Sequence, residues 1–229
     1  MNTTIAERLN SALETIQDSA RSANRQPNNI SLLAVSKTKP ITMIEQAYAA
    51  GQRLFGENYV QEGVDKIQQL SSLEDIEWHL IGPLQSNKCK VVARHFDWVQ
   101  SVDRLKIATR LNDNRPEDMP PLNVCLQVNI SGETTKSGML LEELMTNAEQ
   151  VSKLSRLHLR GIMAIPSNTD NETALAEEFR ALHAGFVELK TRFNSVDTLS
   201  MGMSRDVALA IANGSTMVRV GTAIFGKRN

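Results

Sequence analysis

The sequence predicts an α/β fold: a single domain over residues 1–229 in which eight parallel strands alternate with helices and close into a (β/α)8 TIM barrel. Three observations lead to this prediction. Short apolar runs alternate with amphipathic segments along the whole chain, a pattern typical of a parallel sheet covered by helices. Eight such units within 229 residues favour a closed barrel, usually about 250 residues long, over an open sheet. No repeat, low-complexity stretch or linker divides the chain.

An extra helix is expected ahead of the barrel. Thr4 and Glu7 have the spacing of a capping box, and apolar residues follow at helical intervals until about Asn24. The run 30–37 is short, apolar and bounded by prolines on both sides, which indicates a buried strand. This run is therefore assigned as the first strand of the barrel.

The remaining elements follow the same alternation. Thr42 and Glu45 form a second capping pattern, which predicts the start of the next helix. The loop 112–121 is rich in Asn, Asp and Pro and indicates a surface excursion. The other strands are expected at 53–57, 77–82, 97–101, 122–130, 159–165, 197–201 and 217–221, and the helices at 42–50, 58–70, 87–94, 103–112, 139–153, 171–192 and 204–212.

Composition and charge exclude several classes of partner. The net charge is −1 and no long Lys/Arg run occurs, so we expect no nucleic-acid partner. The first residues lack the order of a signal peptide, and no apolar run approaches the roughly 18 residues of a membrane span. A soluble, cytoplasmic monomer is the expectation.

Cys89 and Cys125 are isolated and are expected as reduced, partly buried thiols. The four histidines show no metal-ligand spacing, so no metal site is expected.

Lys37 lies at the predicted end of the first strand, and functional residues of such barrels gather at the carboxyl ends of the strands. A lysine becomes a useful nucleophile when burial or a nearby cation lowers its pKa. Lys39 would share the face of Lys37 if the strand continued through both. The alternative is an ordinary solvated lysine at a strand end.

Two stretches near the C-terminus indicate a phosphate cradle after the seventh and eighth strands. Ser204 and Thr222 offer hydroxyl groups, and Gly221 allows close backbone approach. Asp206 is interpreted as a capping or helix-dipole residue. Arg219 interrupts an apolar strand and needs a partner, because a guanidinium keeps its proton. It forms either a structural ion pair or a contact with the ring nitrogen of a cofactor, and the sequence leaves both open.

Three polar clusters follow other strand ends, at 55–59, 79–88 and 129–138. All are expected around the same mouth of the barrel. Within them, Asn58 has the alternative of capping the helix that follows, and His79 that of a satisfied core histidine. Met139 is expected to begin a helix core rather than to line a pocket.

Six segments spread over most of the chain form a distinctive set. They are Leu33-Ala-Val-Ser-Lys-Thr38, Phe55-Gly-Glu-Asn58, Trp78-His-Leu-Ile-Gly-Pro-Leu-Gln-Ser-Asn-Lys88, Gly161-Ile-Met-Ala164, Leu199-Ser-Met-Gly-Met-Ser204 and Phe225-Gly226. Together they resemble one family, the pyridoxal-phosphate homeostasis proteins, also called the YggS or PROSC family. The resemblance implies a fold-type III barrel similar to the N-terminal barrel of alanine racemase, with pyridoxal 5′-phosphate as cofactor.

The resemblance also implies roles for single residues. Lys37 matches the lysine that forms the Schiff base, and Arg219 matches the arginine that faces the pyridine nitrogen. Phosphate-binding positions match Ser204, Gly221 and Thr222. Asn58 and Met201 complete the set of expected cofactor-binding residues.

The expected function is to hold and release the cofactor without dedicated catalysis, so no catalytic residue is assigned. An arginine at the ring nitrogen disfavours carbanion chemistry because it cannot accept the ring proton. Lys39 and Lys136 are candidate transient acceptors during release, and cofactor-dependent apo-enzymes are candidate recipients. One alternative is a racemase of a small amino acid, with Tyr59 or His79 as proton donor, although the chain ending at Asn229 leaves no room for a second domain. Another is an interaction module with a structural cofactor.

Overall fold

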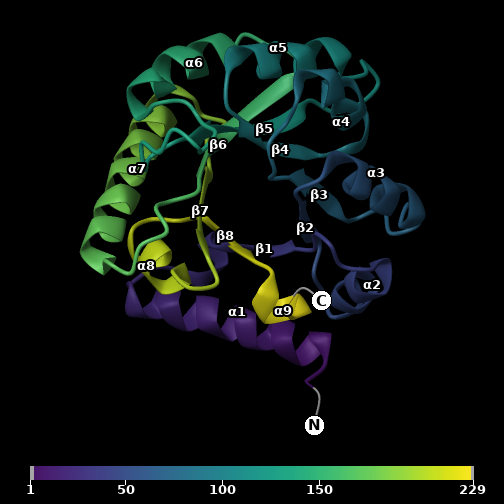
Figure 1. Cartoon of the computed structure of the whole chain (residues 1–229), viewed down its shortest axis with the longest axis vertical. Helices are drawn as coiled ribbons and strands as arrows, with labels where there is room; N and C mark the ends of the chain where they lie inside the picture. Colours follow the sequence, from purple (N-terminus) through teal and green to yellow (C-terminus); the bar gives the residue numbers. More distant parts are fainter. Residues whose placement is uncertain (1–2, 228–229) are drawn as a thin grey trace.

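The computed structural model describes residues 3–227 and shows eight strands in one closed, all-parallel barrel in chain order, with β8 pairing with β1 (Figure 1). This confirms the predicted barrel. The strands are β1 (Ser31–Val35), β2 (Leu54–Glu57), β3 (Glu77–Leu80), β4 (Trp98–Val102), β5 (Leu122–Val128), β6 (Leu157–Ala164), β7 (Thr198–Met203) and β8 (Met217–Val220).

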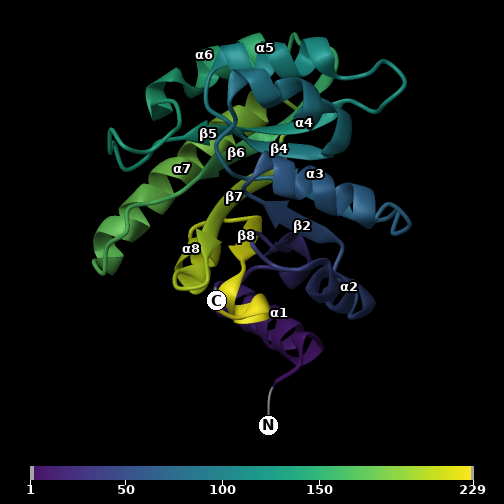
Figure 2. The ribbon, with the colours of Figure 1, turned by 45° about the vertical axis from the view of Figure 1, so that its right-hand side comes forward.

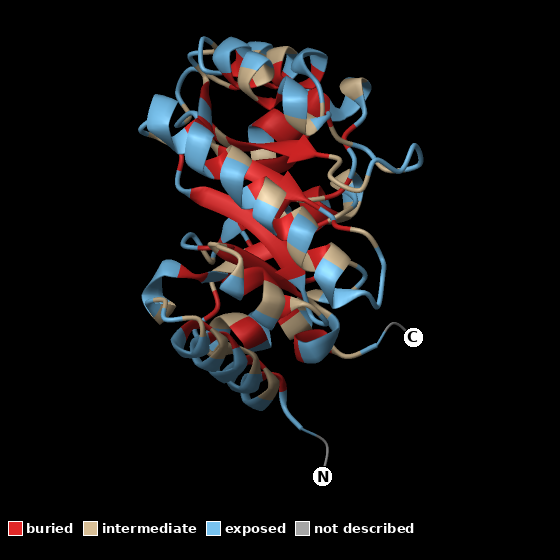
Figure 3. Ribbon diagram, turned by 90° about the vertical axis from the view of Figure 1, so that its left-hand side faces the viewer, coloured by how far each residue is buried: buried red, intermediate tan, exposed pale blue. Residues whose placement is uncertain are grey.

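Helices surround the barrel on its outer face, and all the strands between them are largely buried (Figure 3). The helices are α1 (Ile5–Ser22), α2 (Ile41–Ala49), α3 (Val60–Gln69), α4 (Cys89–His95), α5 (Leu105–Asn114), α6 (Leu144–Val151), α7 (Glu172–Arg192), α8 (Val207–Ala212) and α9 (Thr222–Phe225). Three short 3-10 turns are η1 (Pro27–Asn29), η2 (Ser86–Lys88) and η3 (Leu141–Glu143). None of the helices within 3–227 combines the length and apolar content of a membrane span.

The extra N-terminal helix α1 is confirmed. The Thr4 hydroxyl accepts a hydrogen bond from the Glu7 backbone N–H at 3.2 Å, and the Glu7 carboxylate accepts one from the Thr4 N–H at 2.8 Å, so two N–H groups at the helix start are satisfied. The helix packs on α8 and α9 and buries Ile5, Leu9 and Ile16. It therefore covers the part of the barrel where β8 closes onto β1 (Figure 2).

Two predicted helix starts are wrong and one helix was missed. Helix α2 begins at Ile41 and has no side-chain cap, because Pro40 precedes it with a φ of −67° that already suits helix entry; the capping role expected of Thr42 is not seen. Met139 does not begin a helix: its backbone pairs with Val128, and the helical turn starts only at Leu141. The short helix α9 was not predicted.

Candidate functional site

The expected cofactor-binding residues lie within or just after β7, β8, β1 and β2, which are consecutive neighbours around the barrel. The closed barrel therefore brings these residues from the two ends of the chain to one mouth. The pairing of Leu33 with Arg219 and of Arg219 with Met203 fixes the heights of β1, β8 and β7 at this mouth. No sequence pattern gives this register, since it depends on closure of the whole sheet.

Lys37 lies in a tight turn directly after β1, not inside the strand, which ends at Val35. The Ser36 N–H donates to the Gly56 carbonyl at 3.0 Å, and the Lys39 N–H donates to the Ser36 carbonyl at 3.1 Å. Thr38 adopts a φ of +62°, a conformation that non-glycine residues adopt at a cost. The chain thus bends sharply at the expected Schiff-base lysine.

A buried cluster of charged side chains holds this turn. The Lys66 ammonium donates to the Ser36 carbonyl at 2.8 Å, to Glu57 Oε1 at 2.8 Å and to Glu62 Oε1 at 2.7 Å. Its side chain is only 6% exposed and that of Glu57 is fully buried. Burial raises the pKa of Glu57, and the adjacent Lys66 works against that rise. The Lys66 ammonium thus donates hydrogen bonds to two carboxylates and one carbonyl beneath the turn.

The same cluster contacts the turn on both sides of Lys37. The Ser36 hydroxyl donates to Glu57 Oε1 at 2.6 Å, and the Thr38 N–H donates to Glu62 Oε1 at 2.5 Å. Sequence reasoning missed these groups. Glu62 and Lys66 have the i,i+4 spacing of an ordinary surface ion pair, and only docking of α3 against the turn buries the lysine.

Arg219 is buried in β8, and its guanidinium is held by neutral oxygens. One terminal nitrogen donates to the Ser200 carbonyl and hydroxyl, both at 2.8 Å, and the other donates to the Ala164 carbonyl at 2.8 Å. Within 3–227 it takes part in no salt bridge, so the ion-pair interpretation is wrong. Burial lowers its pKa to about 10, partly opposed by Asp206, and the group therefore remains a cation at neutral pH.

The expected phosphate-binding residues lie after β7 and β8. Ser204 is exposed in the turn after β7, and Thr222 is exposed at the first position of α9. A Cβ on Gly221 would lie 3.1 Å from the Val35 carbonyl oxygen, so a larger residue would press on the end of β1. Asp206 does not cap α8 with its side chain. Its carboxylate accepts the Met203 N–H instead and so closes the turn that carries Ser204.

Asn58 and Met201 have different surroundings. Asn58 does not cap α3, whose N-cap is Tyr59 without a side-chain hydrogen bond. Its Oδ1 is buried and has no hydrogen-bond partner within the described residues, and a Cβ on Gly82 would collide with the Asn58 backbone. Met201 is fully buried within β7 and belongs to the main hydrophobic cluster. A cofactor contact for either residue stays a prediction.

His79 is a fully buried residue of the barrel interior. Its Nδ1 lies 3.0 Å from the Gln100 amide nitrogen, and its ring stacks on Trp98 at 4.9 Å between centroids. Gln100 Oε1 accepts from the Ser200 hydroxyl at 2.6 Å, so the amide nitrogen must donate and Nδ1 must accept. The neutral ring then carries its proton on Nε2, which has no hydrogen-bond partner among the described residues. A chain of hydrogen bonds thus links Arg219 to His79.

His79 is expected to make the fold sensitive to acid. Burial, with a smaller contribution from Arg160, lowers its pKa to about 3, whereas an unfolded histidine titrates near 6.5. The unfolded chain therefore binds the proton first, and His79 should remove about 2 kcal/mol of stability between pH 6.5 and 5. Urea unfolding at both pH values should show a smaller loss in His79→Gln; an equal loss would contradict this assignment.

Lys39 and Lys136 both lie near the mouth but are engaged elsewhere. Because β1 ends before Lys37, Lys39 does not continue its strand face; its ammonium donates to the Lys227 carbonyl at 2.8 Å. Lys136 bonds Glu133 Oε1 at 2.7 Å and the Pro166 carbonyl at 2.9 Å. It therefore bridges the loops that follow β5 and β6.

Cys89 and Cys125 are free and buried.

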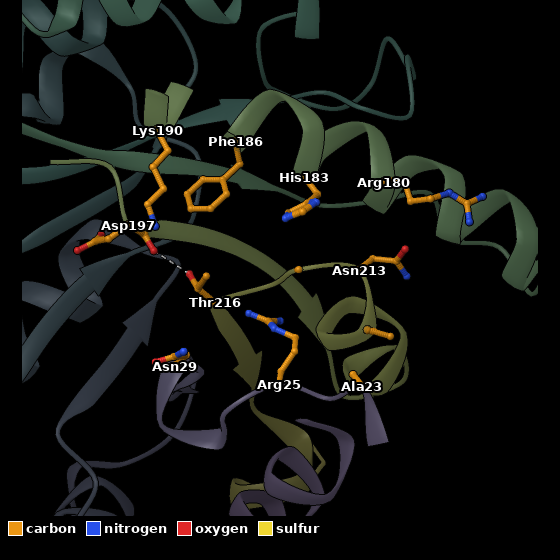
Figure 4. Close-up of a pocket in the computed structure, with 12 residues that line it drawn as sticks. Ala23, Arg25, Asn29, Arg180, His183, Phe186, Lys190, Asp197, Asn213 and Thr216 are labelled. Carbon is orange, nitrogen blue, oxygen red and sulfur yellow. Dashed lines mark hydrogen bonds between the residues drawn. The ribbon is translucent and has the colours of Figure 1, made fainter. Parts of the chain in front are cut away.

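A large cavity, drawn in Figure 4, is lined by residues that precede β1, β7 and β8 and so lies at the end of the barrel opposite Lys37. It has a volume of about 760 Å³, and none of the expected cofactor-binding residues lines it. Its walls come from the segments that precede β1, β7 and β8, together with one side of α7. This cavity is separate from the mouth described above.

Comparison with known proteins defines the class. Residues 11–229 match the family model of the alanine racemase N-terminal domain. The barrel superposes on alanine racemase from Corynebacterium glutamicum with a TM-score of 0.69 at 15% identity, over 96% of this chain and 62% of that chain; this likeness shows the fold alone. The fold and the family model thus define an alanine racemase-type barrel.

Much closer relatives narrow the assignment within that class. The chain is 55% identical to the pyridoxal phosphate homeostasis protein of Escherichia coli K12, over 98% of this chain and 97% of the relative, and 54% identical to that of Haemophilus influenzae, over 98% and 96%. The structure of PipY from Synechococcus elongatus with PLP bound matches with a TM-score of 0.84 at 39% identity, covering 97% of this chain and all of that one. The chain belongs to the family of the pyridoxal phosphate homeostasis proteins.

Proposed function

We propose that the chain binds pyridoxal 5′-phosphate as a Schiff base on Lys37 and acts in homeostasis of the vitamin by holding and releasing it. The observation that carries this proposal is the turn that contains Lys37. Hydrogen bonds with Lys66 and Glu62 hold this turn at the same barrel mouth as the buried cation Arg219. The PLP-bound structure of the PipY relative supports it. The expected phosphate positions Ser204, Gly221 and Thr222 fit because barrels often bind phosphate after their last two strands.

The residues present fit this cofactor. Asn58 Oδ1 is a buried acceptor without a hydrogen-bond partner among residues 3–227, and a bound molecule at the mouth could supply the missing donor. The cofactor supplies an aldehyde that condenses with a primary amine and a ring that accepts electrons. Arg219 is held rigidly by three hydrogen bonds from its terminal nitrogens, and such a cation can donate to a ring nitrogen but cannot take up a proton from it.

A carrier role without dedicated catalysis follows from the same residues. A ring nitrogen that faces a permanent cation stays unprotonated, which weakens the ring as an electron sink. A racemase would also need proton donors beside the substrate. Tyr59 is 53% exposed, and His79 is enclosed in the barrel interior. A racemase of a small amino acid is therefore the less favoured alternative.

Release to a recipient apo-enzyme would take place at the open mouth. The exposed apolar side chains of Tyr59 and Ile165 follow β2 and β6, and that of Met203 ends β7. They offer a contact surface there. Lys136 and Lys39 are proposed as transient acceptors of the leaving cofactor. Unchanged transfer of the cofactor to an apo-enzyme after both lysines are replaced by alanine would exclude that step. We further propose that the protein acts as a cytoplasmic monomer.

The central test is an absorbance spectrum of the purified protein before and after borohydride reduction. Wild type should show a Schiff-base band, and mass spectrometry after reduction should find the cofactor on Lys37. Lys37→Ala should lose the band completely, whereas Lys153→Ala, which alters an exposed lysine, should keep it. A wild-type protein that stays colourless after incubation with pyridoxal phosphate would refute the proposal.

A further inference from the structure

The cavity at the end of the barrel remote from Lys37 gathers basic side chains from two separate parts of the chain. Arg25 follows α1, whereas Arg180, His183 and Lys190 all belong to α7. Figure 4 shows Arg25 reaching in from the side of the cavity opposite α7. The chain as a whole has a net charge of −1, so this grouping is not the consequence of a basic surface overall.

The cations among them, Arg25, Arg180 and Lys190, are not neutralised by carboxylates of the described part of the chain. None of the three takes part in an ion pair within 3–227. Among the described residues the wall contains one acidic side chain, Asp197. Its carboxylate binds the Arg160 guanidinium and accepts the Thr198 hydroxyl at 2.7 Å. The cavity therefore presents an excess of positive charge to whatever enters it.

The protein holds two of these side chains in place. One terminal nitrogen of Arg25 donates to the Ile211 carbonyl at 2.8 Å and the Ser215 carbonyl at 2.6 Å. The His183 ring packs so closely on Gly214 that a Cβ there would lie 2.3 Å from it, and Gly214 itself adopts a φ of +100°. Such anchoring reduces the conformational entropy lost when a ligand binds.

We propose that this cavity is a second ligand site, for a small organic molecule that carries at least two negative charges, such as a phosphate ester or a diphosphate. Its volume of about 760 Å³ lies within the range of about 300–1,000 Å³ of small-molecule sites. Arg180 and Lys190 supply charge from α7 opposite Arg25, and the amides of Asn29 and Asn213 add polar contacts to the wall.

The test uses inorganic pyrophosphate as the probe in isothermal titration calorimetry. It is titrated into two samples of the protein. One is free of pyridoxal phosphate. The other is loaded with the cofactor and reduced with borohydride, so that the cofactor's own phosphate position is filled. Pyrophosphate should bind both forms. The double variant Arg180→Gln/Lys190→Gln should bind it roughly tenfold more weakly, a loss of about 1.4 kcal/mol. Added NaCl should weaken wild-type binding.

The matched control is Arg192→Gln, which removes a charge from the same helix outside the cavity, where Arg192 pairs with Glu149. It should bind pyrophosphate like wild type. Binding that is absent in wild type, or equal in the double variant, overturns the second site. Binding lost only in the reduced, loaded protein also overturns it, because the anion then occupies the cofactor's phosphate position. If the protein takes up no pyridoxal phosphate, the cofactor-free form alone decides the question.

Discussion

Replacement of Lys66 by methionine is expected to lower the free energy of unfolding by about 3–5 kcal/mol. The substitution leaves two carboxylates, Glu57 and Glu62, beside each other under the Lys37 turn without their shared cation. Glu57 is fully buried, so water cannot replace the lost partner. The Ser36 carbonyl also loses its hydrogen bond from the ammonium. Urea unfolding at pH 7 measures the effect.

A second substitution separates the lost cation from lost packing. In Lys66→Met/Glu57→Gln the buried carboxylate becomes neutral, and much of the stability should return, because a buried ion pair replaced as a whole often costs little. Lys153→Met changes an exposed lysine and should stay within about 0.5 kcal/mol of wild type. A Lys66→Met protein as stable as wild type would mean that the cluster does not hold the turn.

The barrel was predictable because its signal is repeated eight times along the chain. Each strand is an apolar run and each helix an amphipathic one, so errors at single boundaries do not change the topology. The error at Met139 arose because a tertiary contact decides where that helix begins. The backbone of Met139 pairs with Val128, the last residue of β5. No residue pattern near Met139 predicts that pairing.

The candidate site residues could be chosen from the sequence, but the groups that hold them in place could not. The position of Lys37 after an apolar run, and of Arg219 within one, marks both residues in the sequence. The partners of Arg219 are the carbonyls of Ala164 and Ser200, and backbone groups leave no sequence signature. The burial of Lys66 likewise depends on how α3 docks, which the spacing of charges along a helix does not reveal.

Replacement of Gly161 by alanine is expected to destabilise the barrel by more than about 4 kcal/mol, at the far end of the range for single substitutions. Gly161 has a φ of +153° and lies where the register of β5 and β6 shifts. An added Cβ would lie 1.8 Å from the Thr198 carbonyl oxygen of the neighbouring strand β7. The clashing atom belongs to the backbone of a strand in the closed barrel, which has little room to yield, so β6 and β7 must separate.

The control for this prediction is Gly51→Ala. Gly51 also has a positive φ, +100°, but a Cβ there meets nothing within 4 Å, so it should cost only the backbone strain of about 1–3 kcal/mol. Soluble yield and urea midpoints of both variants give the comparison, and equal values would contradict the clash.

The Gly161→Ala substitution should also weaken cofactor binding at the mouth of the barrel. Arg219 binds carbonyls on both β6 and β7, so any soluble Gly161→Ala protein should hold its cofactor more weakly than the equally folded Gly51→Ala.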